Sequence, residues 1–187
     1  MSEDEPRLPV LYVVVCGGRP AQDAPGFVEQ AQAQGWEVCV VATPSAKKFI
    51  NVARLSEITG HVVRYDYKQP EEPDVLPPAQ AMAVAPATFN TVNKWAAGIS
   101  DTLALGLLNE AIGLGLPIIA VPFPNIALAQ HPAFQRSVAD LRKFGVHLLF
   151  DPEVYQLPTP NMGRPSAALF PWDALLVELE QTRRRLS

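Results

Sequence analysis

Residues 81–125 read AMAVAPATFNTVNKWAAGISDTLALGLLNEAIGLGLPIIAVPFPN. Two short apolar runs, residues 81–85 and 117–121, lie at the ends of this stretch. The segment between them is typical of one long helix, which opens at Asn90 and ends at Gly113. A crossover of this kind predicts that the two apolar runs are parallel strands of one sheet.

Each of these runs is followed by a polar, proline-containing segment. We call residues 86–91 the first elbow and residues 122–125 the second elbow. In parallel sheets with helices on both faces, ligands bind at the carboxyl ends of the strands. The two elbows are therefore predicted to form one site.

The rest of the chain alternates strand-like and helix-like segments, which predicts a three-layer, doubly wound α/β fold with a mostly parallel, Rossmann-like (flavodoxin-like) sheet. A disordered acidic tail, residues 1–7, is expected before a single domain, residues 8–187. The other expected strands are residues 8–16, 36–42, 61–65 and 146–150. The other expected helices are residues 26–34, 46–59, 126–144 and 171–185.

Composition excludes several classes of function. The chain has 187 residues and a net charge of −4, with no basic cluster large enough to bind nucleic acid. No apolar run approaches the roughly 20 residues of a membrane helix, and the acidic start is unlike a signal peptide. We expect a cytoplasmic protein without a metal site, in which Cys16 and Cys39 are reduced and unpaired.

Glycines and hydroxyl side chains follow the first two expected strands. Gly17 and Gly18 form a turn that could hold a phosphate with backbone N–H groups, or could be a plain tight turn. The third glycine of the dinucleotide fingerprint is missing. Thr43 and Ser45 could contact a ligand, or could simply cap the next helix.

The first elbow, PATFNT, is followed by Lys94, Gly98 and residues 101–103 (DTL). This pattern resembles the signature of the flavin-containing cysteine decarboxylases, which is Pro-Ala-Ser/Thr-Ala-Asn-Thr and then Lys, Gly and Asp-Asn-Leu-Leu. That family includes phosphopantothenoylcysteine and peptidyl-cysteine decarboxylases. The second elbow, PFPN, is similar to the family's Pro-Ala-Met-Asn substrate clamp.

The resemblance implies a bound FMN. The turn after the first strand would hold the phosphate, with hydroxyls reaching the phosphate or the ribityl chain. The first elbow would line the isoalloxazine edge, and two later residues could reach the cofactor or the next subunit. The residues that the resemblance assigns to the cofactor are Gly17, Gly18, Arg19, Thr43, Ser45, Phe49, Pro86, Ala87, Thr88, Ser100 and Asp101.

The resemblance also assigns residues to the substrate. Asn125 would bind the substrate carboxylate, or it could be a turn residue. Asn90 would order the first elbow, or it could be a helix N-cap. Arg164, with Asn161 and Met162, falls where the family has a flap and could meet an anionic substrate, unless this segment is a linker.

Several family features are missing. The position of the catalytic histidine falls on Glu72, and the cysteine of the family's flap has no counterpart after Cys39. Pro124 replaces the clamp methionine, and Leu128-Ala129 replaces a Met-Trp pair. Phe89 replaces a small residue of the signature, which could narrow the pocket.

The missing histidine bears on the chemistry. Family decarboxylation requires oxidation of the thiol-bearing carbon to a thioaldehyde, assisted by a base, and then loss of carbon dioxide. Imidazole suits that role near neutral pH, whereas a carboxylate needs burial to raise its pKa. Glu72 and Asn125 are the weak catalytic candidates that the sequence leaves.

Three hypotheses remain. The first is an FMN-binding flavoprotein, redox-active on an unknown small molecule, in which standard decarboxylation is lost or altered. The second is an authentic decarboxylase of a cysteine conjugate. If the protein is an enzyme, the first two hypotheses make it an oxidoreductase or a carboxy-lyase. The third is a non-enzymatic binding module. The resemblance also implies self-association as a trimer or larger, with the flavin at a subunit boundary.

Overall fold

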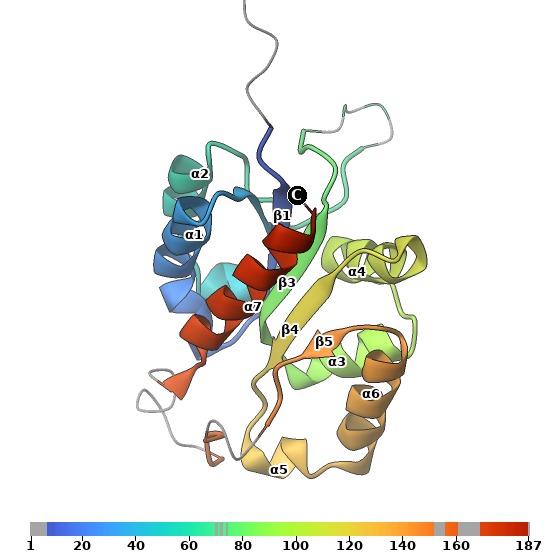
Figure 1. Ribbon diagram of the computed structural model, residues 1–187. Coiled ribbons are helices and arrows are strands. Elements are labelled where there is room, and N and C mark those ends of the chain that lie inside the picture. The colour runs from blue at the N-terminus through green and yellow to red at the C-terminus, as the bar shows by residue number, and fades with distance from the viewer. Residues whose placement is uncertain are drawn as a thin grey trace, which may run out of the picture.

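The computed structural model describes residues 7–69, 71, 73, 75–151, 156–160 and 169–186. They form a five-stranded, all-parallel sheet of order β2-β1-β3-β4-β5, which confirms the doubly wound α/β fold (Figure 1). The strands are β1 (Val10–Val15), β2 (Glu37–Ala42), β3 (Ala81–Ala87), β4 (Ile118–Pro122) and β5 (His147–Leu148).

Helices cover both faces of the sheet, so the central strands are apolar on both sides (Figure 1). Every residue of β1, β3 and β4 is buried, and a fully buried Val or Leu contributes about 1.5–3 kcal/mol. One face carries α1 (Ala24–Ala33), α2 (Val52–Thr59) and α7 (Trp172–Leu186). The other carries α3 (Phe89–Ala96), α4 (Leu103–Leu114) and α6 (Pro132–Lys143).

The connection between β3 and β4 is two helices, so the expectation of one long helix was wrong. Gly98, with φ of 70°, ends the α3 segment in a left-handed conformation. Thr102 then begins α4, because its hydroxyl accepts a hydrogen bond from Leu105 N at 3.3 Å. The apolar pattern runs through both helices and therefore hides the break.

Side-chain caps divide two other expected helices in the same way. Residues 46–59 form the 3₁₀ helix η2 (Pro44–Lys48) and then α2, which Asn51 caps by accepting from Arg54 N at 3.0 Å. Residues 126–144 form the one-turn helix α5 (Ile126–Ala129) and then α6, which begins after His131.

The expected strand at residues 61–65 is reduced to an isolated parallel bridge between Arg64 and Val41. Two residues further on, the Asp66 carboxylate accepts a hydrogen bond from Tyr67 N at 2.9 Å. Before the bridge, side chains of α2 take the backbone donors: His61 N donates to Thr59 Oγ1 at 3.2 Å and Val63 N donates to Ser56 Oγ at 3.3 Å. These local bonds compete with pairing to β2. The other expected strands are present, although β5 is shorter than residues 146–150.

Candidate functional site

The two elbows lie side by side at the carboxyl edge of the sheet. Ala87 at the end of β3 pairs with Pro122 at the end of β4, and Phe123 N donates a hydrogen bond to Ala87 O at 2.9 Å. This backbone bond fixes the start of the second elbow against the first, so side chains from both elbows can reach one ligand.

The turn after β1 packs tightly between the ends of its two neighbouring strands. Cys16 N donates to Pro86 O at 3.3 Å, which joins this turn to the first elbow. A Cβ at Gly17 would lie 2.8 Å from Ser45 Cβ, and one at Gly18 would lie 3.4 Å from Pro86 Cγ. The close approach of three chain segments therefore requires glycine at position 17 and brings Ser45 and Pro86 to the same turn.

Polar groups suited to a phosphate surround this turn. Arg19 begins the 3₁₀ helix η1 (Arg19–Asp23), and its side chain is exposed. Ser45 is also exposed, on η2. Thr43 is buried and makes no capping hydrogen bond with its side chain. A guanidinium and hydroxyls beside a glycine turn fit an anionic phosphate group.

The Thr88 hydroxyl is engaged within the first elbow. It accepts a hydrogen bond from Thr91 N at 3.4 Å, which caps α3, and lies 3.0 Å from the Thr91 hydroxyl. Thr88 is therefore the N-cap of α3, a role that the sequence left open for Asn90. Asn90 itself lies inside α3 with an exposed side chain. Pro86 follows a cis peptide bond with Ala85.

The thiol of Cys16 lies beneath the glycine turn. Burial raises its pKa above the ordinary value, although hydrogen bonds with the Thr91 side chain and the Thr88 backbone act in the opposite direction. This thiol therefore stays neutral at physiological pH and is a packing residue. Cys39 is also buried and free, so the cysteines are unpaired as expected.

Ser100 and Asp101 lie in the connection between α3 and α4. Asp101 forms an ion pair with Lys94, and the Ser100 hydroxyl accepts from Asn109 Nδ2 at 2.9 Å. The eight residues of α3, a length of about 12 Å, lie between these two residues and Thr88 along the chain.

The other residues that the sequence singled out include two in the elbows and two that the structure does not describe. Phe49 is half-buried and packs against the core on the α1 side of the sheet. Asn125 caps α5, and its Oδ1 accepts from Leu128 N at 2.9 Å. Glu72 and Arg164 lie outside the described residues. Phe89 packs against α6, with its ring centroid 5.7 Å from that of Phe134.

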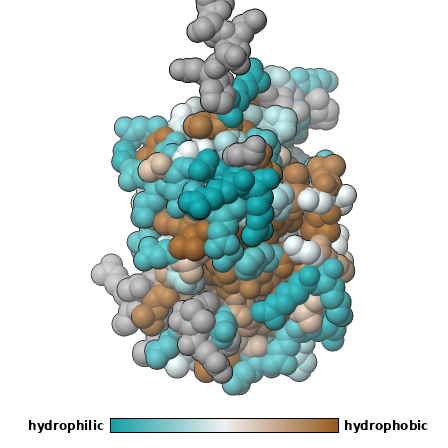
Figure 2. Space-filling view, in the orientation of Figure 1, coloured by the Kyte–Doolittle hydropathy of each residue, from teal (hydrophilic) through white to brown (hydrophobic). Residues whose placement is uncertain are grey.

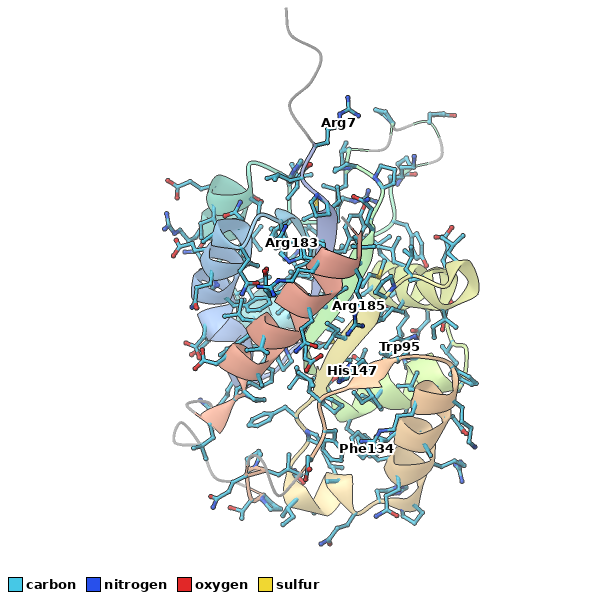
Figure 3. The ribbon with its side chains drawn as sticks, in the orientation of Figure 1. Arg7, Trp95, Phe134, His147, Arg183 and Arg185 are labelled. Atoms are coloured by element: carbon cyan, nitrogen blue, oxygen red, sulfur yellow. The ribbon has the colours of Figure 1, made fainter. Side chains whose placement is uncertain are left out.

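The structure brings one residue to this edge that the sequence did not single out. The His131 ring meets Phe89 edge-on, with centroids 5.7 Å apart. The other two histidines have different partners. His61 Nε2 lies 3.1 Å from a Glu37 oxygen. His147, which is labelled in Figure 3, has its Nδ1 3.7 Å from a Glu178 oxygen on α7. Pro132, directly after His131, was the available signal, because proline favours the first turn of a helix.

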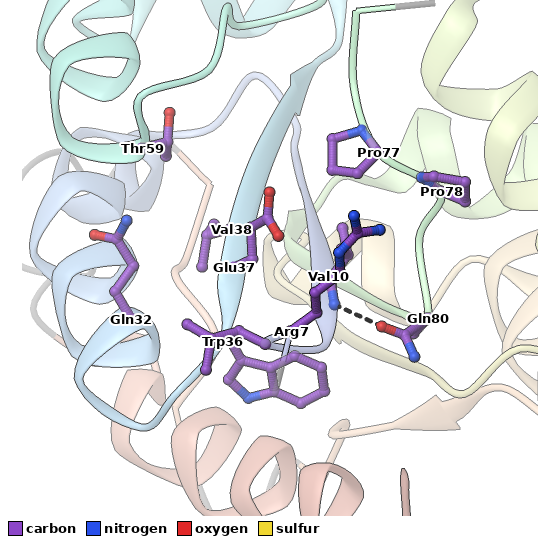
Figure 4. Close-up of a pocket in the computed structure, with 11 residues that line it drawn as sticks. Arg7, Val10, Gln32, Trp36, Glu37, Val38, Thr59, Pro77, Pro78 and Gln80 are labelled. Atoms are coloured by element: carbon purple, nitrogen blue, oxygen red, sulfur yellow. Dashed lines mark hydrogen bonds between the residues drawn. The ribbon is translucent and has the colours of Figure 1, made fainter. Parts of the chain in front are cut away.

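A cavity of about 660 Å³ lies at the opposite edge of the sheet (Figure 4). Its lining includes Val10 and Glu37, the first residues of β1 and β2, and Gln80, whose Oε1 accepts from Val10 N at 3.0 Å. Because doubly wound sheets bind ligands at the carboxyl ends of their strands, we place the site at the elbows and not in this cavity.

Neither a metal site nor a membrane span is found in the part of the chain that the structure describes. Its histidines, cysteines and acids form no group of three that could hold a metal ion. Its helices are too short or too polar to cross a bilayer.

Comparison with known proteins supports a flavin-linked identity. A sequence model of the Flavoprotein family matches residues 2–184. The chain is 26% identical over 177 residues to the probable phosphopantothenoylcysteine decarboxylase of Streptococcus mutans, covering 91% of this chain and 97% of that protein. It is 32% identical over 165 residues to the coenzyme A biosynthesis bifunctional protein CoaBC of Mycobacterium tuberculosis (strain ATCC 25618 / H37Rv), covering 86% of this chain and 38% of that protein.

The fold matches as well. The structure of the FMN-dependent cysteine decarboxylase SpaF superposes on this chain with a TM-score of 0.71 at 24% identity. The superposition covers 94% of this chain and 97% of the SpaF chain. The fold and the elbows at its carboxyl edge define a flavodoxin-like α/β protein. The chain belongs to the Flavoprotein family, and its resemblance to the cysteine decarboxylases is confirmed.

Proposed function

We propose that this chain binds FMN at the carboxyl edge of its sheet and acts on an unidentified small molecule, with the standard cysteine decarboxylation lost or altered. The observation that carries the proposal is the glycine turn held between Ser45 and Pro86, beside the joined elbows. The FMN-dependent cysteine decarboxylase SpaF, with the same fold, supports FMN as the particular flavin.

The residues of the turn and the first elbow would hold the cofactor. Gly17, Gly18 and Arg19 would bind the phosphate, and Thr43 and Ser45 would supply hydroxyls to the phosphate or the ribityl chain. Residues 86–88 would line the ring edge, where a backbone N–H or the Thr88 hydroxyl, whose oxygen caps α3, would donate to the flavin. When bound, FMN supplies two-electron redox chemistry.

The bases that the chain offers support the proposal that decarboxylation is lost or altered. His61 and His147 contact carboxylates away from the elbows, and His131 uses Nδ1 to accept a hydrogen bond from Ala133 N. Glu72, at the position of the family histidine, would act as a base near neutral pH only if burial raised its pKa.

Two measurements test this function. Purified protein should show visible flavin absorbance, or bind added FMN with unit stoichiometry, and should release FMN on denaturation. A colourless protein that does not bind FMN would refute the proposal and favour a binding module. The loaded protein should release no carbon dioxide from phosphopantothenoylcysteine or from a peptide that ends in cysteine, whereas release would establish the decarboxylase alternative.

We also propose that the protein self-associates as a trimer or larger, in a reducing, cytoplasmic compartment. The surface over α4 is rich in hydrophobic residues (Figure 2). Leu114, at the end of α4, is 68% exposed, and Ile99, whose carbonyl accepts from Asn109 of α4, is 43% exposed. An exposed apolar surface of this kind suits a subunit interface. Light scattering of wild type and Leu114→Glu should show a trimer or larger assembly that the charge weakens, and a wild-type monomer would refute this.

A further inference from the structure

The cavity at the amino edge of the sheet is separate from the elbows, and its volume of about 660 Å³ lies in the range of small-molecule sites, about 300–1,000 Å³. Its lining includes the first residues of β1 and β2, whereas the glycine turn and the elbows follow the last residues of the strands. The six residues of β1, at about 3.3 Å each, separate the two edges by roughly 20 Å. A ligand of this cavity is therefore a different molecule from one held at the elbows.

Three residues that line the cavity form a row across three adjacent strands. Val10 of β1 is the register partner of Glu37 of β2. On the other side of β1, Leu11 pairs with Ala81, and the Val10 carbonyl accepts from Gln80 N at 2.9 Å. Residues at matching positions of neighbouring strands point to the same face of a sheet. Because adjacent strands are about 4.8 Å apart, the main chains of Glu37 and Gln80 lie about 10 Å from each other, with the apolar Val10 between them.

The two ends of this row offer opposite groups to a ligand. The Glu37 carboxylate accepts from His61 Nε2 at 3.1 Å and keeps its negative charge when the imidazole is neutral. Gln80 Oε1 accepts from Val10 N at 3.0 Å, so the amide retains the two N–H donors of Nε2 (Figure 4). The Glu37 end therefore suits an ammonium group, and the Gln80 end suits a carboxylate.

Other side chains of the lining extend the same pattern. Gln32 of α1, which lines the cavity from the β2 side, donates through Nε2 to a main-chain carbonyl of α2 at 3.1 Å, so its Oε1 remains a second acceptor near that end. Arg7 has an exposed side chain that adds a positive charge, and Figure 4 shows its guanidinium on the Pro77 side of the cavity. The buried Trp36 contributes apolar surface to the same lining. Acceptors and donors therefore lie on different sides of a partly apolar cavity.

We propose that this cavity binds a small zwitterion whose ammonium and carboxylate groups lie at opposite ends of an apolar body, as in an ω-amino acid. The ammonium group binds at Glu37, the carboxylate binds at Gln80 and Arg7, and the methylene chain lies over Val10. One end of a protein chain carries only one of these two charges, so the ligand is a free small molecule. Its binding does not depend on the flavin, because the two sites lie at opposite edges of the sheet.

Calorimetric titration at pH 8 with four compounds tests this site. The first compound is 6-aminohexanoate, and the second is its isomer norleucine, which carries both charges at one end. Hexanoate and hexylamine each lack one of the two charges. Wild type should bind 6-aminohexanoate about fivefold more tightly than each of the other three, which is the upper end of the effect expected for a partly exposed ion pair.

Two isosteric variants separate the two ends of the row. Glu37→Gln keeps an oxygen that accepts from His61 and removes the charge, so 6-aminohexanoate and hexanoate should then bind equally and hexylamine more weakly. Gln80→Glu keeps an oxygen that accepts from Val10 N and replaces the N–H donors with a charge that repels a carboxylate, so 6-aminohexanoate should bind no more tightly than hexylamine. The matched control is Glu178→Gln, which alters a carboxylate beside a histidine outside the cavity and should behave as wild type. Far-UV circular dichroism should be the same for all of these proteins.

Failure of wild type to bind 6-aminohexanoate at millimolar concentration would overturn the proposal, as would equal affinity for all four compounds or unchanged preferences in both variants. The titrations should give the same affinities with and without FMN. Flavin absorbance of the same samples tests the proposed function separately. Protein that binds 6-aminohexanoate but no FMN would support the zwitterion site and refute the flavoprotein, and the reverse result would do the opposite.

Discussion

The two sides of the carboxyl edge are built in different ways. On the side of β1 and β2, main-chain proximity shapes the site: Gly17 packs so closely on Ser45 that a side chain has no room. On the side of β4, the side chains of Asn125 and His131 shape it, and each also caps a helix. In the second elbow and the helix after it, Pro124 and Leu128 stand where the resemblance expects methionines. Cofactor binding and substrate choice are therefore expected to respond to different substitutions.

The largest effect that tests this contrast is expected at position 17. Gly17→Ala would place a Cβ 2.8 Å from Ser45 Cβ and force η2 away from the turn. A displacement of this kind can cost about 100-fold, and we expect a loss of FMN affinity of that order, measured by flavin fluorescence quenching.

The matched control is Gly26→Ala on α1, where an added Cβ meets no atom within 4 Å. This variant should bind FMN as wild type does and unfold at an equal or higher temperature, because alanine favours a helix over glycine. Normal FMN binding by Gly17→Ala would show that the turn is not the phosphate site.

A second test concerns the buried strands beneath the cofactor side. Burial and then the Glu37 carboxylate raise the pKa of Cys39 to about 12, from an ordinary value of 9.0. Above pH 9 the unfolded thiol loses its proton while the folded thiol keeps it. The free energy of unfolding should therefore fall by about 1.4 kcal/mol per pH unit from this residue, up to about pH 12.

Urea unfolding of wild type and Cys39→Ala between pH 8 and about pH 11 measures this contribution. The alanine variant should be less stable at pH 8 because of the cavity, and its stability should fall less steeply above pH 9. Parallel pH dependences in the two proteins would mean that Cys39 is solvated in the fold.

A smaller effect is expected at Arg19. Arg19→Gln removes a charged donor from the rim of the turn, so FMN affinity should fall about tenfold while riboflavin affinity stays the same. The FMN effect should shrink at high salt. An equal loss for both ligands would place Arg19 away from the phosphate. Arg185→Gln at the end of α7 provides the control.

The smallest effect concerns the aromatic contact that supports His131. Phe89→Leu should lower the free energy of unfolding, measured by urea denaturation, because the imidazole loses its edge-on partner. In a double-mutant cycle with His131→Ser, the coupling should be about 0.5–1 kcal/mol. Additive effects would show that Phe89 does not position the ring.

Much of the fold could be predicted because apolar runs mark buried strands. The breaks between α3 and α4, and between α5 and α6, could not. These breaks depend on the side chains of Thr102 and His131, which cap α4 and α6. The apolar pattern of the sequence does not show whether a side chain acts as a cap. The strand expected at residues 61–65 failed for a related reason, because the Thr59 and Ser56 side chains accept from His61 N and Val63 N.

The candidate site shows the same division. Its location at the two elbows could be predicted, because it follows from strand order and from a motif with fixed spacing. The partners of individual side chains could not. The engagement of the Thr88 hydroxyl in capping and the contact between Phe89 and His131 depend on how α3 and α6 meet in space.

The bond from Phe123 N to Ala87 O has an evolutionary consequence. Since it joins main-chain atoms, any residue except proline at position 123 preserves it. Lineages can thus exchange the chemical groups of the second elbow one after another while the first elbow keeps its place. A single main-chain hydrogen bond of this kind lets a family change the ligand that it recognises while the binding site of its prosthetic group stays the same.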